Sequence, residues 1–97
     1  MTQREHILAD LRDALPGLKR RWPIRSLALF GSIVRGDAGP DSDLDILVEF
    51  ERPVGLRTFL ELELELATLA RRGVDLVSRA ALKPFIGETI IREAVLL

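Results

Sequence analysis

Apolar and polar residues follow two different periodic patterns along this chain, and each pattern predicts one kind of secondary structure. Short apolar runs that alternate with polar residues, or are almost continuous, are typical of strands in a sheet. Longer stretches that repeat apolar residues every three or four positions predict amphipathic helices. On these patterns we expect strands at residues 24–30, 43–50 and 74–77, and helices at residues 2–15, 32–35, 56–72 and from Lys83-Pro84 onward.

Glycine and proline indicate where the predicted helices end. Pro16-Gly17 should stop the first helix, because proline lacks the amide hydrogen that a helix interior needs. Gly73 should end the long helix before the third strand, since glycine readily adopts the left-handed conformation that follows many helices. Helices and strands in this order predict an α+β fold, a small mixed β-sheet with helices packed on it. We expect residues 1–97 to form a single domain, because the chain is long enough for one modest core.

The segment Glu61–Leu66, with the sequence ELELEL, fits a strand as well as a helix. We predict a helix, because leucine, glutamate, alanine and arginine are strong helix formers and β-branched residues are few here. The apolar stripe of this helix is broad, which indicates contacts on more than one side, under the sheet or against a partner. The residues expected on the stripe are Leu56, Phe59, Leu60, Leu64 and Ala67, broadened by Leu62, Leu66 and Leu69.

The last predicted helix has little polar surface. Part of its apolar surface must pack on the domain. The remainder fits two interpretations equally, a simple core or an interface for a partner, because exposed apolar patches mark partner sites. The apolar residues concerned are Phe85, Ile86, Ile90, Ile91, Ala94 and Val95.

Composition narrows the class of protein. The 97 residues are 47% hydrophobic and 30% charged, which is ordinary for a globular protein. A net charge of −1 argues against stable nucleic-acid binding, for which a basic domain is expected. The absence of cysteine excludes a disulfide and a thiolate metal site. We expect no membrane segment, no signal peptide and a cytoplasmic location, because no apolar run approaches about 18 residues and the N-terminal stretch is charged.

Asp43 and Asp45 are the first candidates for chemistry. Side chains two residues apart on a strand point to the same face, with Cα atoms about 6.6 Å apart. The opposite face of this strand is apolar and should lie on the core, which leaves both carboxylates pointing out beside Leu47 in a partly desolvated place. Carboxylates there are costly without a counter-charge, and a divalent cation would supply one. The apolar face consists of Leu44, Ile46, Val48 and Phe50.

A phosphate site is predicted just upstream. Gly31-Ser32 follows the first strand and opens a helical turn, whose unpaired amide groups favour an anion. Gly31 lacks a Cβ and would let a phosphate approach closely, while the Ser32 hydroxyl can cap the turn or donate to a phosphate oxygen. Arg35 shares the face of Ser32 and can also reach a phosphate. Carboxylates that hold metal beside a phosphate site are typical of metal-assisted phosphoryl transfer.

The spacing of these residues resembles a known family. Gly31-Ser32, ten intervening residues and then Asp43-Leu44-Asp45 resemble the signature of the DNA polymerase β-like nucleotidyltransferase superfamily. The longer run FGSIVRGDAGPDSDLDILVEF resembles the minimal nucleotidyltransferases (MNT proteins) found beside HEPN-domain proteins in prokaryotic toxin–antitoxin pairs. The resemblance covers nearly the whole chain and implies the polymerase β-like fold. It also implies a third carboxylate on a later strand, a position that Asp75 matches, although a plain surface aspartate is the alternative there.

The resemblance further implies an activity, the transfer of AMP from ATP to a tyrosine hydroxyl of a HEPN ribonuclease toxin. Two Mg²⁺ ions would be the cofactors, ATP the substrate, and the toxin the partner in an oligomeric complex. This chain has no tyrosine, so the acceptor must come from elsewhere. The resemblance implies catalytic, metal-binding acids at Asp43, Asp45 and Asp75, and nucleotide-binding residues at Gly31, Ser32 and Arg35.

Two other functions stay open. The chain can neutralise a toxin by binding alone, or it can transfer a nucleotide to RNA or a small molecule. The complete set of acids and the glycine–serine turn favour an enzyme over a pure binding module. Nucleotidyltransferases that act on RNA or on a small molecule usually carry an additional substrate domain, which this sequence does not show.

Several polar residues have a simpler structural interpretation. The basic residues 19–21 before Trp22 can bind RNA or an acidic partner, but a solvated connection in which Trp22 packs locally is favoured. Asp37 and Asp41 are extra acids near the predicted metal site, and both are expected to make turn and cap hydrogen bonds. Ser42 is expected to hold the backbone ahead of Asp43.

Overall fold

The structure is a computed structural model that describes residues 2–97. Each predicted helix and strand is present, some with different ends, and one short strand was not predicted. The elements are α1 (Gln3–Arg21), β1 (Ile24–Phe30), α2 (Ser32–Arg35), β2 (Leu44–Phe50), α3 (Leu56–Ala70), β3 (Val74–Ser78), the 3₁₀ turn η1 (Arg79–Ala81), α4 (Pro84–Glu93) and β4 (Val95–Leu96).

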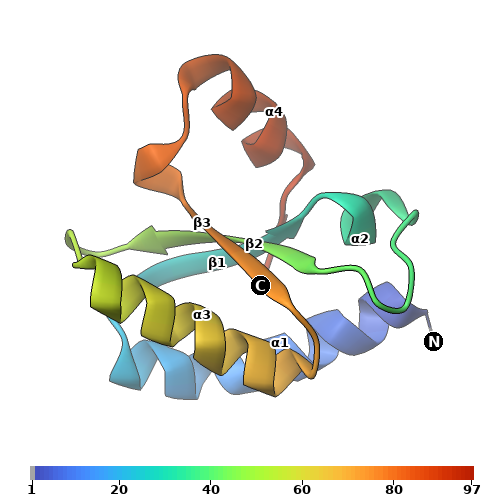
Figure 1. Ribbon diagram of the computed structural model, residues 1–97, viewed down its shortest axis with the longest axis horizontal. Coiled ribbons are helices and arrows are strands. Elements are labelled where there is room, and N and C mark those ends of the chain that lie inside the picture. The colour runs from blue at the N-terminus through green and yellow to red at the C-terminus, as the bar shows by residue number, and fades with distance from the viewer. Residues whose placement is uncertain (1) are drawn as a thin grey trace.

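The strands form one mixed sheet in the order β3-β2-β1-β4. β1 is antiparallel to both β2 and β4, whereas β2 is parallel to β3. A parallel pair needs a crossover connection, which α3 provides between the end of β2 and the start of β3. The predicted α+β architecture, a small mixed sheet with helices packed on it, is therefore confirmed (Figure 1).

Helices cover the two faces of the sheet unequally. α1 and α3 lie along one face, and α4 stands on the other side of the sheet (Figure 1). Under α4 there is a small core, where Ala28, Phe30 and Leu47 meet Ile90 and Ala94. The larger core under α1 and α3 includes Leu8, Leu11, Leu18, Leu27, Leu29, Leu44, Ile46, Val48, Leu62, Leu66 and Leu76. Alternate residues of β1 and β2 thus serve two separate cores.

The prediction that the first helix ends at Pro16-Gly17 is wrong. α1 continues through Pro16 to Arg21. A proline in a helix interior removes a hydrogen bond and costs about 3 kcal/mol. The longer helix buries Leu18 completely and brings Arg21 and Trp22 within 2.7 and 2.9 Å of the Glu65 carboxylate on α3. These contacts offset the cost of the proline, and the half-buried Trp22 plugs this end of the core as expected.

Only part of the broad stripe predicted for α3 lies in the core. Leu62 and Leu66 are buried, whereas Leu56, Leu60 and Leu64 are 72%, 49% and 69% exposed. At about 100° per residue, these two sets of leucines lie on opposite sides of the helix. Periodicity alone cannot tell which set faces the sheet. The packing of α3 against β3 and α1 decides it.

Two further ends differ from the prediction. α3 ends at Ala70, and the left-handed residue that follows is Arg71, with φ of 57°, rather than Gly73. α4 ends at Glu93, and the next residues leave the helical path so that Val95–Leu96 pairs with β1 as β4. Pairing satisfies backbone groups at the edge of β1 that a longer helix would leave open.

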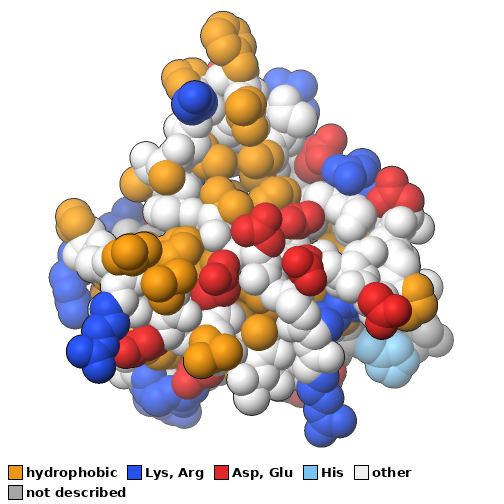
Figure 2. Space-filling view, viewed as in Figure 1, with side chains coloured by type: hydrophobic (Ala, Val, Ile, Leu, Met, Phe, Trp, Pro, Cys, Tyr) orange, Lys and Arg blue, Asp and Glu red, His pale blue; other side chains and the backbone are white. Residues whose placement is uncertain are grey.

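Helix α4 has an inner and an outer side. Ile90 and Ala94 pack on the sheet, while Phe85, Ile86 and Ile91 are exposed. Both interpretations of this helix therefore hold in part, a core on the inner side and a candidate partner surface on the outer side. Figure 2 shows apolar side chains gathered at the top of the molecule, where α4 lies. Between residues 2 and 97, no helix has the length and hydrophobicity that a membrane span requires.

Candidate active site

The pairing of β2 with β3 brings two of the predicted acids together. Asp45 lies directly opposite Asp75 in the parallel pair, at a strand spacing of about 4.8 Å. Asp45 is also the cross-strand partner of Phe30 on β1. Because cross-strand partners share a face, Asp45 stands between an aromatic ring and a second carboxylate. Asp43 directly precedes β2, and its charge also reaches Asp45.

Burial and repulsion act together on Asp45. It is partly buried as predicted, whereas Asp43 is exposed, so the expected desolvation holds for one acid of the pair. Burial raises the pKa of the Asp45 carboxyl, the charge of Asp75 raises it further, Arg35 lowers it, and Asp43 raises it slightly. The net shift is upward, because burial and the neighbouring carboxylates together outweigh the opposing charge of Arg35. Figure 2 shows acidic side chains near the middle of the visible face, below the apolar residues of α4.

The Gly31-Ser32 bend lies against the same acids. Gly31 has φ of 75° and ψ of −149°, a conformation essentially restricted to glycine. A Cβ at Gly31 would overlap the Asp45 carboxylate. Asp45 therefore fills the space on the Cβ side of Gly31, and the approach of a phosphate to this backbone stays a prediction. Ser32 begins α2 and is partly accessible to solvent, so the bend is not sealed off.

The charge of Arg35 reaches Asp45, and two acidic partners pair with its guanidinium. It lies 3.7 Å from Asp37 and 3.7 Å from Glu93 of α4. Exposed pairs at this distance contribute little to stability. Breaking these two pairs therefore costs little free energy. The Asp37 amide donates to the Ser32 carbonyl at 3.1 Å, a backbone hydrogen bond that does not involve the carboxylate expected to cap the turn.

Two residues that the sequence prediction missed complete the surroundings of Asp43. The Arg72 guanidinium donates to the carbonyl oxygens of Gly39 and Ser42, in the loop that leads to Asp43. Gly73 lies against Asp43, whose carboxylate would overlap a Cβ at that position. The sequence signal was an Arg-Gly pair just before the strand of Asp75, which by itself indicates only a helix end. Ser42 holds the loop as expected, since its hydroxyl accepts from the Gly39 amide at 2.9 Å.

Comparison with known proteins agrees with this geometry. A nucleotidyltransferase domain matches residues 11–97. The chain belongs to the nucleotidyltransferase domain family. This nucleotidyltransferase domain is 47% identical over 78 residues to the protein adenylyltransferase MntA of Thermococcus cleftensis, over 80% of this chain and 79% of that protein. The family predicted from the Gly31-Ser32 and Asp43-Asp45 spacing is confirmed, and so is its assignment as a nucleotidyltransferase enzyme.

Solved structures share the fold of this nucleotidyltransferase domain. A chain provisionally described as a minimal nucleotidyltransferase superposes with a TM-score of 0.82 at 38% identity, over 99% of this chain and 97% of that chain. The rebuilt structure of a tri-AMPylated Shewanella oneidensis HEPN toxin in complex with MNT antitoxin matches with a TM-score of 0.60 at 22% identity, over 96% of this chain and 66% of that chain. The second likeness shows the fold alone.

The donor set of the nucleotidyltransferase site fits a divalent cation. Carboxylate oxygens are the ligands that Mg²⁺ prefers. Within residues 2–97, no three acidic or histidine side chains already converge closely enough to hold an ion. Asp43 and Asp75 are exposed, however, and their side chains have room to turn toward a cation beside Asp45. Burial and the charge of Asp75 raise the pKa of Asp45, and a bound cation would favour the charged form of this carboxyl.

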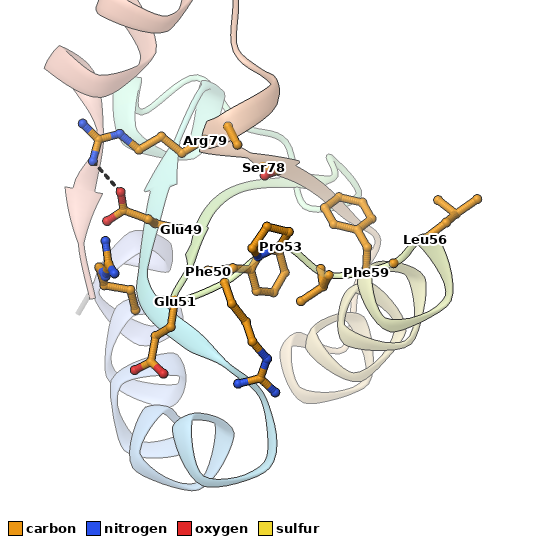
Figure 3. A pocket seen from close by; sticks show the side chains of 13 residues that line it. Glu49, Phe50, Glu51, Pro53, Leu56, Phe59, Ser78 and Arg79 are labelled. Atoms are coloured by element: carbon orange, nitrogen blue, oxygen red, sulfur yellow. Dashed lines mark hydrogen bonds and ion pairs between the residues drawn. The ribbon is translucent and has the colours of Figure 1, made fainter.

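A cavity of about 750 Å³ lies at the other end of β2 (Figure 3). It is lined by Phe50, Pro53 and Phe59, and the ion pair between Glu49 and Arg79 lies at its wall. Five residues of strand, about 16 Å, separate Phe50 from the acids at the start of β2. The nucleotidyltransferase site is therefore distinct from this cavity.

Proposed function

We propose that this chain transfers AMP from ATP to a tyrosine hydroxyl of a HEPN ribonuclease toxin, and that it is the antitoxin of that toxin. One observation carries the proposal: Asp45 and Asp75 lie opposite each other on adjacent strands, beside Asp43 and the Gly31-Ser32 bend. The 47% identity to an MntA adenylyltransferase supports AMP as the transferred group. Residues 1–97 would act as a single catalytic domain.

In this proposal Asp43, Asp45 and Asp75 would hold two Mg²⁺ ions. Mg²⁺ bound there would neutralise charge on the triphosphate and make the acceptor hydroxyl a better nucleophile. Ser32 and the amide groups of the bend would hold the β- and γ-phosphates. Arg35 would leave Asp37 and Glu93 and pair with the same phosphates, because a phosphate offers a stronger charge-assisted partner.

The proposed reaction is one displacement at phosphorus. The acceptor oxygen forms a bond to the α-phosphorus of ATP. The bond from that phosphorus to the oxygen bridging to the β-phosphorus breaks, and pyrophosphate leaves with that electron pair. The hydroxyl proton passes to Asp75, an exposed carboxylate on the edge strand β3.

The absence of tyrosine from this chain bears on where the acceptor hydroxyl lies. It contains no tyrosine, so the modified hydroxyl must belong to another molecule. Asp43 and Asp75 are exposed, which suits an acceptor carried on a protein surface. The AMPylated HEPN toxin that is bound to an MNT antitoxin of this fold supports that choice. Such a pair would act in the cytoplasm, and the net charge of −1 argues against stable RNA binding by this chain.

Mass measurement of the partner tests the proposal directly. The chain is incubated with the protein encoded beside it, ATP and Mg²⁺, and the partner is then weighed as an intact protein. We expect a gain in steps of one AMP, located on tyrosine by peptide sequencing. Asp45→Asn should abolish the gain, while Asp13→Asn, which removes an exposed acid of α1, should leave it unchanged.

Other results would identify the competing functions. A tight complex without any mass gain would make the chain a binding-only antitoxin. Labelled AMP found on RNA or on a small molecule, in the absence of a protein partner, would indicate a different nucleotidyltransferase. Unchanged transfer by Asp45→Asn would contradict the assignment of the acids.

A further inference from the structure

The guanidinium of Arg72 bridges two backbone carbonyls of one loop. Its Nε donates to the Ser42 oxygen at 2.8 Å, and its Nη2 donates to the Gly39 oxygen at 3.0 Å and also to the Ser42 oxygen. Arg72 is partly buried, so these hydrogen bonds are shielded from competing water. The planar fork of an arginine can reach both carbonyls at once, which a lysine ammonium cannot do with the same geometry.

The loop that Arg72 holds ends at a predicted metal ligand. Ser42 is the residue directly before Asp43. Within the loop, the Ser42 amide donates to the Gly39 carbonyl at 3.2 Å, and the Gly39 amide donates to the Ser42 hydroxyl at 2.9 Å. The turn is therefore closed on itself, and Arg72 fixes it from outside. Asp43 is exposed and receives no hydrogen bond to its carboxylate among residues 2–97, so its position depends on this backbone.

The connection that contains Arg72 also leads directly into the strand of Asp75. The Leu44 amide donates to the Gly73 carbonyl at 2.9 Å, which starts the pairing of β2 with β3. Gly73 gives space to the Asp43 carboxylate, and Asp75 follows two residues later. Figure 1 shows this α3–β3 connection running into β3 alongside β2. One short connection thus binds the backbone on both sides of Asp43, at Ser42 and at Leu44, and begins the strand of Asp75.

We propose that Arg72 is a positioning residue, which holds the Gly39–Ser42 loop so that Asp43 can share a divalent cation with Asp45 and Asp75. The inference rests on the proposed function, because it assumes that the three acids bind metal. In this proposal Arg72 acts through its hydrogen bonds to Gly39 and Ser42 and is not itself a metal ligand. It acts by lowering the freedom of Asp43 before the cation binds, which makes binding tighter.

The experiment compares Arg72→Gln with the wild type in two measurements that need no turnover. Hydrogen exchange of the amides in residues 39–44 reports the order of the loop, and titration with Mn²⁺, followed by its paramagnetic resonance signal, reports metal affinity. In Arg72→Gln we expect loop exchange to rise at least about tenfold and Mn²⁺ affinity to fall by about 10- to 100-fold, as for other residues that orient metal ligands. Thermal melting should show that the variant stays folded.

Two control variants separate positioning from charge and from general instability. Arg71→Gln removes the same charge from the preceding residue, which is exposed, and should leave both the loop and Mn²⁺ affinity unchanged. Arg72→Lys keeps the charge but loses the planar guanidinium. Its loop exchange rate and its Mn²⁺ affinity should lie between those of the wild type and Arg72→Gln. If Arg72→Gln itself unfolds, Arg72→Lys supplies the same comparison.

Each outcome supports or refutes the inference. Wild-type Mn²⁺ affinity in an Arg72→Gln protein with a loosened loop would overturn it, and so would an equal loss of affinity in Arg71→Gln. A wild-type protein that binds no Mn²⁺ would instead refute the proposed function, and the metal role of Arg72 with it. Slow loop exchange in Arg72→Gln would show that the arginine does not hold the loop.

Discussion

Asp45 lies between Phe30, Asp75 and the backbone of Gly31, and most of these surroundings disfavour its charge. Burial, and then the charge of Asp75, raise the pKa of its carboxyl above the ordinary 3.8 despite the opposing Arg35. A raised pKa in the folded state means that this group stabilises the fold at low pH and that the stability is lost as the pH rises through the raised value. At neutral pH the ionised Asp45 therefore destabilises the metal-free protein.

Asp45→Asn should remove that destabilisation. At neutral pH without metal, we expect the variant to melt at a higher temperature than the wild type. The difference should disappear below pH 3.8, where the wild-type carboxyl is neutral. Adding Mg²⁺ should raise the melting temperature of the wild type but not of the variant. Calorimetry across this pH range checks the result, and a variant that melts below the wild type at neutral pH would contradict it.

Gly31 and Gly73 each make room for a carboxylate, but by different means. Gly31→Ala places a side chain at a positive φ, which costs about 1–3 kcal/mol, and also displaces Asp45. Gly73 has no positive φ, so Gly73→Ala should change the free energy of unfolding by about 0.5 kcal/mol or less. It should nevertheless lower AMP transfer strongly, because the new Cβ overlaps the Asp43 carboxylate.

Urea unfolding and the transfer assay together check these two glycine variants. Gly55→Ala is the control, because a Cβ there meets nothing within 4 Å. Normal transfer by Gly73→Ala would show that the position of Asp43 does not matter for the reaction.

At the scale of elements, helices α1 and α3 are joined through the Glu65 carboxylate. Arg21 and Trp22 at the end of α1 both donate to it, at 2.7 and 2.9 Å. Burial alone would raise the pKa of Glu65, but the hydrogen bonds from Trp22 and Arg21 outweigh it, and the pKa is lowered below the ordinary 4.5. A lowered pKa means that this group stabilises the fold above pH 4.5 and that the stability is lost as the pH falls through the lowered value.

Glu65→Gln should therefore destabilise the protein by about 1 kcal/mol at neutral pH, because two hydrogen bonds to a charged acceptor are weakened. Below the lowered pKa of Glu65 the difference from the wild type should shrink, since the wild-type carboxyl is then neutral as well. Urea unfolding at neutral and acidic pH measures both values. Glu61→Gln breaks only an exposed pair with Arg57 and should cost less than about 0.5 kcal/mol. Equal costs for the two variants would contradict the role of Glu65.

At the scale of the whole molecule, α4 exposes apolar side chains on the side of the sheet that carries the acids. Phe85 is 87% exposed, so Phe85→Ser should leave the melting temperature unchanged. Ile90→Ser should lower it, because Ile90 packs on Phe30 and Leu47 in the small core. In the proposed complex we expect Phe85→Ser to weaken binding of the toxin, as measured by calorimetric titration. Unchanged affinity would show that the partner docks elsewhere.

The local features of this nucleotidyltransferase domain could be predicted from the sequence alone. The apolar face of residues 44–50 placed Asp43 and Asp45 on the opposite side of the strand, because side chains alternate strictly along an extended chain. The Gly31-Ser32 turn and its spacing from these acids indicated the family, since both depend on residues close together in the chain. The third acid, Asp75, was matched by its position at the start of a strand, and its pairing with Asp45 agrees with that match.

Only the tertiary structure decided features that depend on contacts between distant residues. α1 runs through Pro16 because Glu65, far along the chain, binds its end. The buried side of α3 was undetermined, because leucines occur on both sides of that helix and only packing selects one. Arg72 contacts the loop that leads to Asp43, and Gly73 contacts Asp43 itself, because β3 pairs with β2. A local pattern determines which elements form, but the free energy of packing them together determines which side chains meet.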